Sequence, residues 1–141
     1  MEPILTKDTV KDLIPQKEPF VMVDTLFAFE EGSLITGFTV PTNHIFTENG
    51  KFAESGVVEH MAQSVALYTG YQYFLRKEQA PTGYIGSIKD VEITELPNIG
   101  DVLVTEAKIL QEFMGITLVD IVTRKDSRQI ACAQMKTVLA K

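Results

Sequence analysis

The chain has 141 residues, 45% apolar content and a formal net charge of −6, which is enough for one domain, residues 1–141, with a hydrophobic core. The negative charge argues against nucleic acid or an anionic membrane as the main partner. No apolar run approaches the ~18 residues of a membrane span, and the N-terminus lacks the form of a signal peptide, so the cytoplasm is the expected compartment. The one cysteine, Cys132, cannot form an intramolecular disulfide and is expected in the core. Two histidines and one cysteine share no ligand spacing, so we expect no metal.

The first third of the chain predicts a short helix and two strands. A helix is expected from Thr6 to Ile14, because Pro15 stops it. Residues rich in Val, Phe and Thr then predict strands at Phe20–Phe29 and Leu34–Val40. The stretch Pro41–Ala53 contains proline, asparagine and glycine and is expected to be irregular.

One long helix is predicted at residues 54 to 77, where no proline occurs and apolar residues recur every three or four positions. Its main apolar stripe comprises Val57, Val58, Met61, Val65, Tyr68 and Gln72. A second stripe contains Glu59 and Gln63 among the small residues Ala62, Ala66 and Gly70, which allow close packing. The remaining sector, with His60, Ser64, Leu67 and Tyr71, is not strongly polar. A helix that is apolar on nearly all sides is a buried helix, so the rest of the chain is expected to wrap it.

Four more strands are predicted after the helix, at Tyr84–Leu96, Val102–Phe113, Ile116–Thr123 and Ile130–Leu139. Their short connections favour antiparallel neighbours. The expected fold class is therefore α+β, with one antiparallel sheet curled around one helix. Such a sheet covers only part of the helix, so a dimer is expected, either of the chain with itself or with a similar subunit.

Several segments, in order, resemble the hotdog-fold β-hydroxyacyl-acyl-carrier-protein dehydratases of the FabZ/FabA type. Leu13-Ile-Pro-Gln-Lys-Glu-Pro-Phe-Val-Met-Val-Asp24 is similar to the family's L-P-H-R-x-P-F-L-L-V-D, and Val58-Glu-His-Met-Ala-Gln63 to its E-A-M-A-Q. Tyr84-Ile-Gly-Ser-Ile-Lys89 and Pro97-Asn-Ile-Gly-Asp101 resemble its F-A-G-I-D and P-G-D segments. The nearest subgroup is the ApeP-like predicted dehydratases of aryl-polyene and flexirubin-type clusters.

The resemblance implies catalytic roles for His44 and Glu59, with no cofactor. Water is eliminated when a histidine removes the Cα proton and a carboxyl group protonates the leaving hydroxyl. Backbone N–H groups at the helix start, at Ser55 and Gly56, would stabilise the enolate. In the family, the histidine of one protomer meets the carboxylate of the other, which requires a dimer.

Other residues near this pair have supporting or reserve roles. Gln63, one turn after Glu59, can hydrogen-bond that carboxylate and fix its rotamer. His60 points about 100° away from Glu59, is expected at the helix surface or an interface, and is the spare candidate for the base.

The sequence also departs from the family's pattern. His44 lies one place further from the carboxylate than in the family, and the catalytic loop lacks both family prolines. The family's early histidine is Gln16 here. The expected activity is dehydration of a 3-hydroxyacyl group on acyl carrier protein in fatty-acid or polyene-type synthesis. The alternatives are a hotdog acyl thioesterase, a catalytically weak subunit of a heterodimeric dehydratase, and an acyl-binding module.

Overall fold

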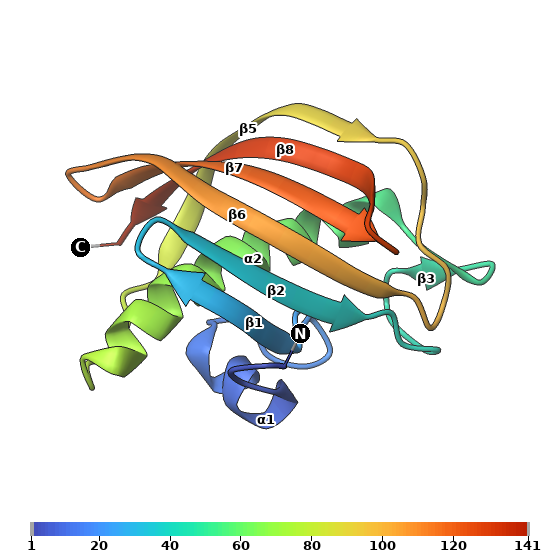
Figure 1. Cartoon of the computed structure of the whole chain (residues 1–141), viewed down its shortest axis with the longest axis horizontal. Coiled ribbons are helices and arrows are strands. Elements are labelled where there is room, and N and C mark those ends of the chain that lie inside the picture. The colour runs from blue at the N-terminus through green and yellow to red at the C-terminus, as the bar shows by residue number, and fades with distance from the viewer. Residues whose placement is uncertain (1, 141) are drawn as a thin grey trace.

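The computed structural model describes residues 2–140, which form one large sheet, one long helix and smaller elements (Figure 1). The elements in chain order are α1 (Lys7–Val10), the 3₁₀ turn η1 (Lys11–Leu13), β1 (Thr25–Glu30), β2 (Ser33–Thr39), β3 (Thr47–Glu48), β4 (Lys51–Phe52), α2 (Glu54–Leu75), β5 (Gly83–Ile93), β6 (Val102–Phe113), β7 (Ile116–Lys125) and β8 (Arg128–Leu139).

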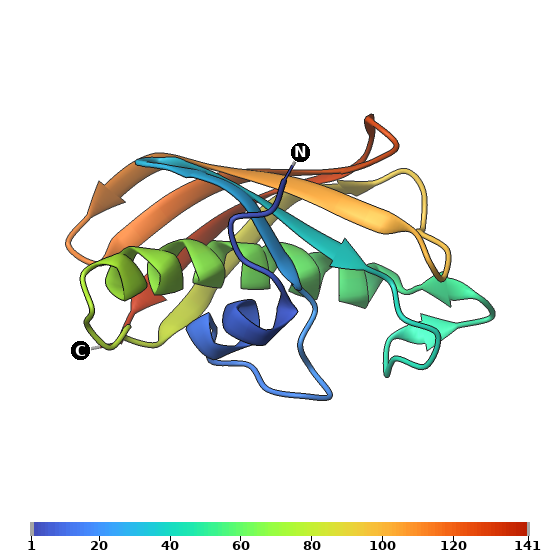
Figure 2. The same cartoon turned by 60° about the horizontal axis from the view of Figure 1, so that its bottom comes forward.

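The large sheet is antiparallel throughout, with strand order β1-β2-β6-β7-β8-β5. Its register shifts within β1, β5 and β6 and near the end of β7. Such shifts bend a strand and increase its twist, which allows the sheet to curl. The curled sheet covers α2 on one side, as Figure 2 shows. This is the α+β hotdog arrangement that the resemblance implied.

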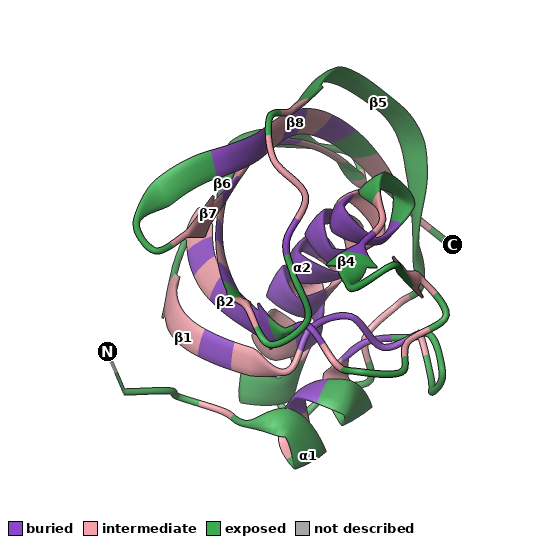
Figure 3. Ribbon diagram, turned by 90° about the vertical axis from the view of Figure 1, so that its right-hand side faces the viewer, coloured by how far each residue is buried: buried purple, intermediate pink, exposed green. Residues whose placement is uncertain are grey.

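Helix α2 is buried along most of its length, as expected from its apolar sides (Figure 3). The sector of His60, Ser64 and Leu67 is fully buried, so the expectation that His60 lies at the helix surface or an interface is wrong. His60 and Ser64 hydrogen-bond the buried threonines of the sheet, Thr105 and Thr36, and Leu67 packs in the apolar core. The open strip is instead the stripe of small residues that begins at Glu59.

The segment Phe20–Asp24 is extended but is not a strand, although the sequence predicted one from Phe20. Asp24 donates its N–H to the carbonyl of Gly37 on β2, but the backbone of Phe20 and Met22 hydrogen-bonds side chains of α2. The N–H of Met22 donates to Gln63 and its carbonyl accepts from His60. The Val-rich stretch before β1 therefore lies outside the sheet ladder, and the helix supplies the partners of Phe20 and Met22.

The other predicted elements differ from the observed ones mainly at their ends. The opening helix is divided into α1 and η1, and Thr6 precedes it without a side-chain cap, its carbonyl accepting from the N–H groups of Thr9 and Val10. The irregular stretch Pro41–Ala53 contains the small β3–β4 hairpin, whose turn places Asn49 and Gly50 at positive φ (54° and 77°). Asparagine and glycine tolerate this backbone conformation best, which explains their presence at the turn.

Strand β5 forms one edge of the sheet and is exposed from Gly83 to Glu92. Several of its exposed side chains are large and apolar, namely Tyr84, Ile85, Ile88 and Val91. An unpaired apolar edge of this length is a template for another strand. Within residues 2–140, no helix combines the length and apolar character needed to cross a membrane.

Replacing Gly70 by alanine is expected to destabilise the fold by about 3 kcal/mol, because the new Cβ would overlap the backbone carbonyl of Leu13. This glycine lets η1 pack directly on α2. Gly83→Ala is the matched control, since its Cβ would meet Leu139 Cδ2 at 3.6 Å and the carbonyl of Val138 at 3.9 Å, both ordinary contact distances. Urea unfolding of both variants measures the difference, and equal stability of Gly70→Ala and wild type would contradict this packing.

Candidate active site

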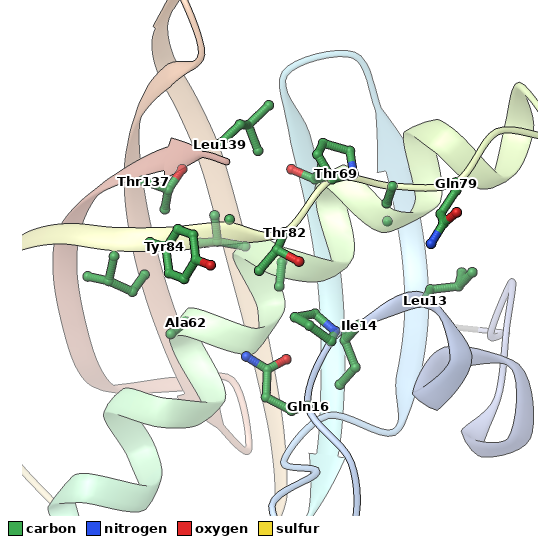
Figure 4. Close-up of a pocket in the computed structure, with 18 of the residues that line it drawn as sticks. Leu13, Ile14, Gln16, Ala62, Thr69, Gln79, Thr82, Tyr84, Thr137 and Leu139 are labelled. Atoms are coloured by element: carbon green, nitrogen blue, oxygen red, sulfur yellow. The ribbon is translucent and has the colours of Figure 1, made fainter. Parts of the chain in front are cut away.

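Glu59 lies on the second turn of α2, is partly buried, and lines a groove of about 440 Å³. The groove runs between α2, the segment after η1, and the start of β5. Figure 4 shows Gln16, Ala62, Tyr84 and Thr137 around it, from four different parts of the chain. The carboxyl group therefore meets a space large enough for a ligand, bordered by small residues of the helix.

Gln63 holds Glu59 in place, as the sequence indicated. Its Nε2 donates to Glu59 Oε2 at 2.8 Å and to the carbonyl of Phe20 at 2.7 Å. Its Oε1 accepts the N–H of Met22 at 2.6 Å. Gln63 is fully buried, and these bonds use both of its N–H donors.

His60 is also fully buried and faces the sheet, away from the groove. Its Nδ1 lies 2.6 Å from the carbonyl of Met22 and its Nε2 lies 2.7 Å from the hydroxyl of Thr105. Burial lowers the pKa of His60 to about 4, against the opposing effects of the Met22 carbonyl and of Asp24. The ring is therefore neutral at physiological pH and does not contact the groove.

His44 sits in the loop before β3, inside a group of aromatic rings formed by Phe38, Phe46 and Phe52. Its Nδ1 accepts the N–H of Phe46 at 3.1 Å, so the neutral ring carries its proton on Nε2. Nε2 is buried and has no hydrogen-bond partner within residues 2–140. Burial lowers the pKa of His44, while the backbone of Val21 and the charge of Glu18 raise it by smaller amounts.

His44 and Glu59 border different cavities of the single chain. His44 lines a shallow pocket with Asn43, Ile45 and Ile99, whereas Glu59 lines the groove beside α2. The described residues contain no hydrogen bond or ion pair that joins the two side chains. The resemblance implied that His44 of one protomer meets Glu59 of the other, and within the single chain the two residues lie apart.

The start of α2 carries the backbone donors that the sequence indicated. The first intrahelical bond runs from the N–H of Val57 to the carbonyl of Ala53, so the N–H groups of Ser55 and Gly56 precede the helical ladder. Gly56 is buried against the ring of Phe52, which a Cβ would overlap at 2.5 Å. These donors therefore lie close to the aromatic rings that surround His44.

One feature of the site carried no recognisable signal in the sequence, and a second, Gln16, was marked only as the position of the family's early histidine. The backbone of Phe20–Met22 binds Gln63, yet an apolar stretch looks like an ordinary strand. The groove wall includes Gln16, whose Oε1 is buried without a partner among the described residues.

Residues 2–140 contain no group of three or more His, Cys, Asp or Glu side chains placed to hold a metal ion.

Residues 8–140 match the model of the ApeP-like family, described as ApeP dehydratase. The chain belongs to this family. It is 27% identical over 133 residues to the 3-hydroxyacyl-[acyl-carrier-protein] dehydratase FabZ of Vibrio cholerae, covering 90% of this chain and 86% of the relative.

Its fold matches the dehydratase heterocomplex ApeI:P from Xenorhabdus doucetiae, with a TM-score of 0.86 and 16% identity over 100% of this chain and 93% of the other. A hypothetical thioesterase from Streptococcus pneumoniae with coenzyme A matches less closely, with a TM-score of 0.65 and 10% identity over 82% and 84% of the two chains. At these identities, both likenesses concern the fold, and they confirm the expected hotdog architecture.

The stability of the ApeP-like chain is expected to fall by about 3 kcal/mol as the pH drops from 6.5 to 4, through His60 alone. The folded state depresses the pKa of this histidine from 6.5 to about 4, so the unfolded state binds a proton first as the pH falls through that window. The contribution of neutral His60 to the free energy of unfolding is therefore fully present above about pH 6.5 and is lost as the pH falls towards 4. Urea unfolding at several pH values measures the slope. In His60→Asn the slope over this window should be flatter, and an unchanged slope would contradict the assignment.

Proposed function

We propose that this ApeP-like chain dehydrates a 3-hydroxyacyl group carried on acyl carrier protein to the trans-2-enoyl thioester, without a cofactor or metal. The proposal rests on one structural observation: Gln63 holds the carboxyl group of Glu59 at the edge of a groove. The chain also belongs to a dehydratase family. The resemblance to FabZ supports the substrate class. The cytoplasm is the proposed compartment.

In the proposed reaction, Glu59 protonates the leaving hydroxyl at Cβ while a histidine removes the proton at Cα. The C–O bond breaks, a Cα–Cβ double bond forms, and the hydroxyl departs as water. Because Gln63 Nε2 already donates to Glu59 Oε2, the acidic proton resides on Oε1. The N–H groups of Ser55 and Gly56 are the proposed donors to the enolate oxygen of the thioester.

The proposed site is assembled from two protomers, with His44 of one acting on the same substrate as Glu59 of the other. The separate cavities of these residues in the single chain support this arrangement, because base and acid must reach adjacent carbons. The exposed edge strand β5 borders the groove that Glu59 lines and is the proposed contact between protomers.

A second candidate function, as one subunit of a heterodimeric dehydratase, is favoured by the state of His44. In the neutral ring, Nε2 of His44 already holds a proton. To accept a substrate proton there, the ring must first transfer that proton to Nδ1, and a protonated Nδ1 can no longer accept the N–H of Phe46. A partner subunit would remove this requirement by supplying the histidine itself. The likeness to the ApeI:P heterocomplex supports such a partner, which would be another hotdog subunit.

Docking of an acidic carrier protein requires a basic patch, and most cations of the β7–β8 turn are already paired. Lys125 bonds Asp101 at 2.7 Å and Glu95 at 3.3 Å, and Arg128 bonds Glu95 at 2.8 Å. The end of α2, with Arg76 and Lys77, is the better candidate, because Arg76 meets Glu78 only at 4.0 Å.

The catalytic roles predict that Glu59→Gln and His44→Ala each lower the rate of enoyl formation by ~10²-fold or more. Glutamine keeps the shape of Glu59 but has no proton to give, and alanine removes the base. Absorbance of the enoyl thioester measures the rate, with 3-hydroxyacyl carrier protein as substrate. The assay is run on the chain alone and together with a second hotdog subunit.

Each outcome of this assay discriminates between candidates. Activity that needs the second subunit and survives His44→Ala supports the heterodimer in which the partner supplies the base. Release of free thiol without enoyl product would identify a thioesterase and overturn the dehydratase proposal. If Glu59→Gln has full activity, Glu59 is not the acid.

Assembly through β5 predicts that the double variant Ile85→Glu, Ile88→Glu is monomeric where wild type is dimeric. Charges on this edge oppose strand pairing and desolvation. The matched control is Ile116→Glu, because Ile116 is equally exposed (43%, against 41% for Ile85 and Ile88) but lies on β7, inside the sheet. Light scattering at micromolar concentration gives the mass. A dimer in the double variant would place the interface elsewhere.

A further inference from the structure

A series of hydrogen bonds, joined through the backbone of Met22, connects the sheet to Glu59 through His60. It begins on β7 with Thr123, whose hydroxyl lies 2.7 Å from that of Thr105 on β6. Thr105 in turn lies 2.7 Å from His60 Nε2, and His60 Nδ1 lies 2.6 Å from the carbonyl of Met22. Beyond Met22 the chain continues through Gln63 to Glu59.

The chemistry of these groups fixes the direction of every bond. A carbonyl only accepts, so His60 Nδ1 carries the proton and donates to Met22. The ring is neutral, so Nε2 is bare and accepts from the hydroxyl of Thr105. Thr105 has then used its one proton, and it must accept from Thr123. All donors point from the sheet towards the helix and on to Glu59.

Met22 is the link between the two helix side chains. His60 holds its carbonyl and Gln63 holds its N–H, and these two residues are neighbours on one face of α2. The N–H of Met22 forces Gln63 to present Oε1, because a rotated amide would place two donors against each other. Gln63 Nε2 must then face Glu59 Oε2.

We propose that His60 is a positioning residue for Glu59, acting through Met22 and Gln63. By holding the carbonyl of Met22, it keeps that residue's N–H against Gln63 Oε1, and this bond fixes the amide orientation together with the bond from Nε2 to the carbonyl of Phe20. This orientation keeps Glu59 Oε2 as an acceptor and leaves Oε1, the oxygen free to face the groove, as the proton carrier. The role in catalysis rests on the proposed dehydratase function, whereas the positioning of Gln63 does not.

Two polar substitutions of His60 separate positioning from simple support of the core. The amide of asparagine imitates Nδ1 and can still donate to Met22, whereas the amide of glutamine imitates Nε2 and reaches towards Thr105. We expect His60→Gln to lower kcat about 10-fold or more with KM within twofold, and His60→Asn to stay within about threefold of wild type. Ser64→Ala is the control, because it removes an equally buried hydroxyl that bonds Thr36 and the backbone carbonyl of His60 but none of the side chains in this chain of bonds. It should lower stability and leave kcat within twofold.

A double variant tests whether His60 acts through Gln63. In a Gln63→Met background, the amide is gone, so adding His60→Gln should lower kcat no further. Additive losses, or equal losses in His60→Gln and His60→Asn, would reduce His60 to a structural residue. The kinetics use the active assembly, with the second hotdog subunit if activity requires it.

NMR of the full chain gives a readout that needs no turnover. In wild type, ¹⁵N spectra should show His60 protonated on Nδ1 only, and the side-chain amide protons of Gln63 should exchange slowly. His60→Gln should accelerate that exchange, and His60→Asn should not. Protonation of His60 on Nε2, or rapid Gln63 exchange in wild type, overturns the proposal even if the variants do not fold. If these spectra are as expected and wild type forms no enoyl product, the positioning stands and the dehydratase function fails.

Discussion

The structure depends on burying a helix that is apolar on nearly every side. A flat sheet could cover only one face of α2, but bulges in β1, β5 and β6 bend the sheet around it. The N-terminal turn covers a further side, where Gly70 admits the backbone of Leu13. What is left open is a strip of small residues headed by Glu59, and this strip borders the groove. The proposed acid is thus placed by the part of the helix that the chain cannot cover.

The segment Phe20–Met22 connects this packing to the chemistry. An extended backbone normally satisfies its polar groups in a sheet, but here Gln63 and His60 take the place of a neighbouring strand. The same bonds that stabilise the segment determine how the amide of Gln63 faces Glu59. The same hydrogen bonds therefore hold the segment in place and align the carboxyl group of Glu59. A change that loosens the segment is expected to lower stability and to disturb that alignment.

Much of the fold was predictable, because it follows from local patterns. The bounds of α2 and β6 came directly from periodicity and turn residues. The burial of His60 against the sheet could not be predicted, because a helix that is apolar all round gives no indication of which stripe faces the sheet. Likewise, Val-rich residues at Phe20–Asp24 favour an extended backbone but do not say which groups will bind it. Glu59 and Gln63 were identifiable because one helical turn separates them, whereas the aromatic surroundings of His44 come from Phe38 and Phe52, on separate strands.

The open edge of β5 has a consequence for the life of the chain in a cell. Newly made copies carry an apolar strand with unpaired backbone groups along its length, the form of surface that seeds aggregation and invites proteases. The time for which a copy remains in this state depends on the concentration of whatever pairs with β5. If a second chain pairs with β5, as proposed, its supply relative to that of this chain sets how much of the protein survives.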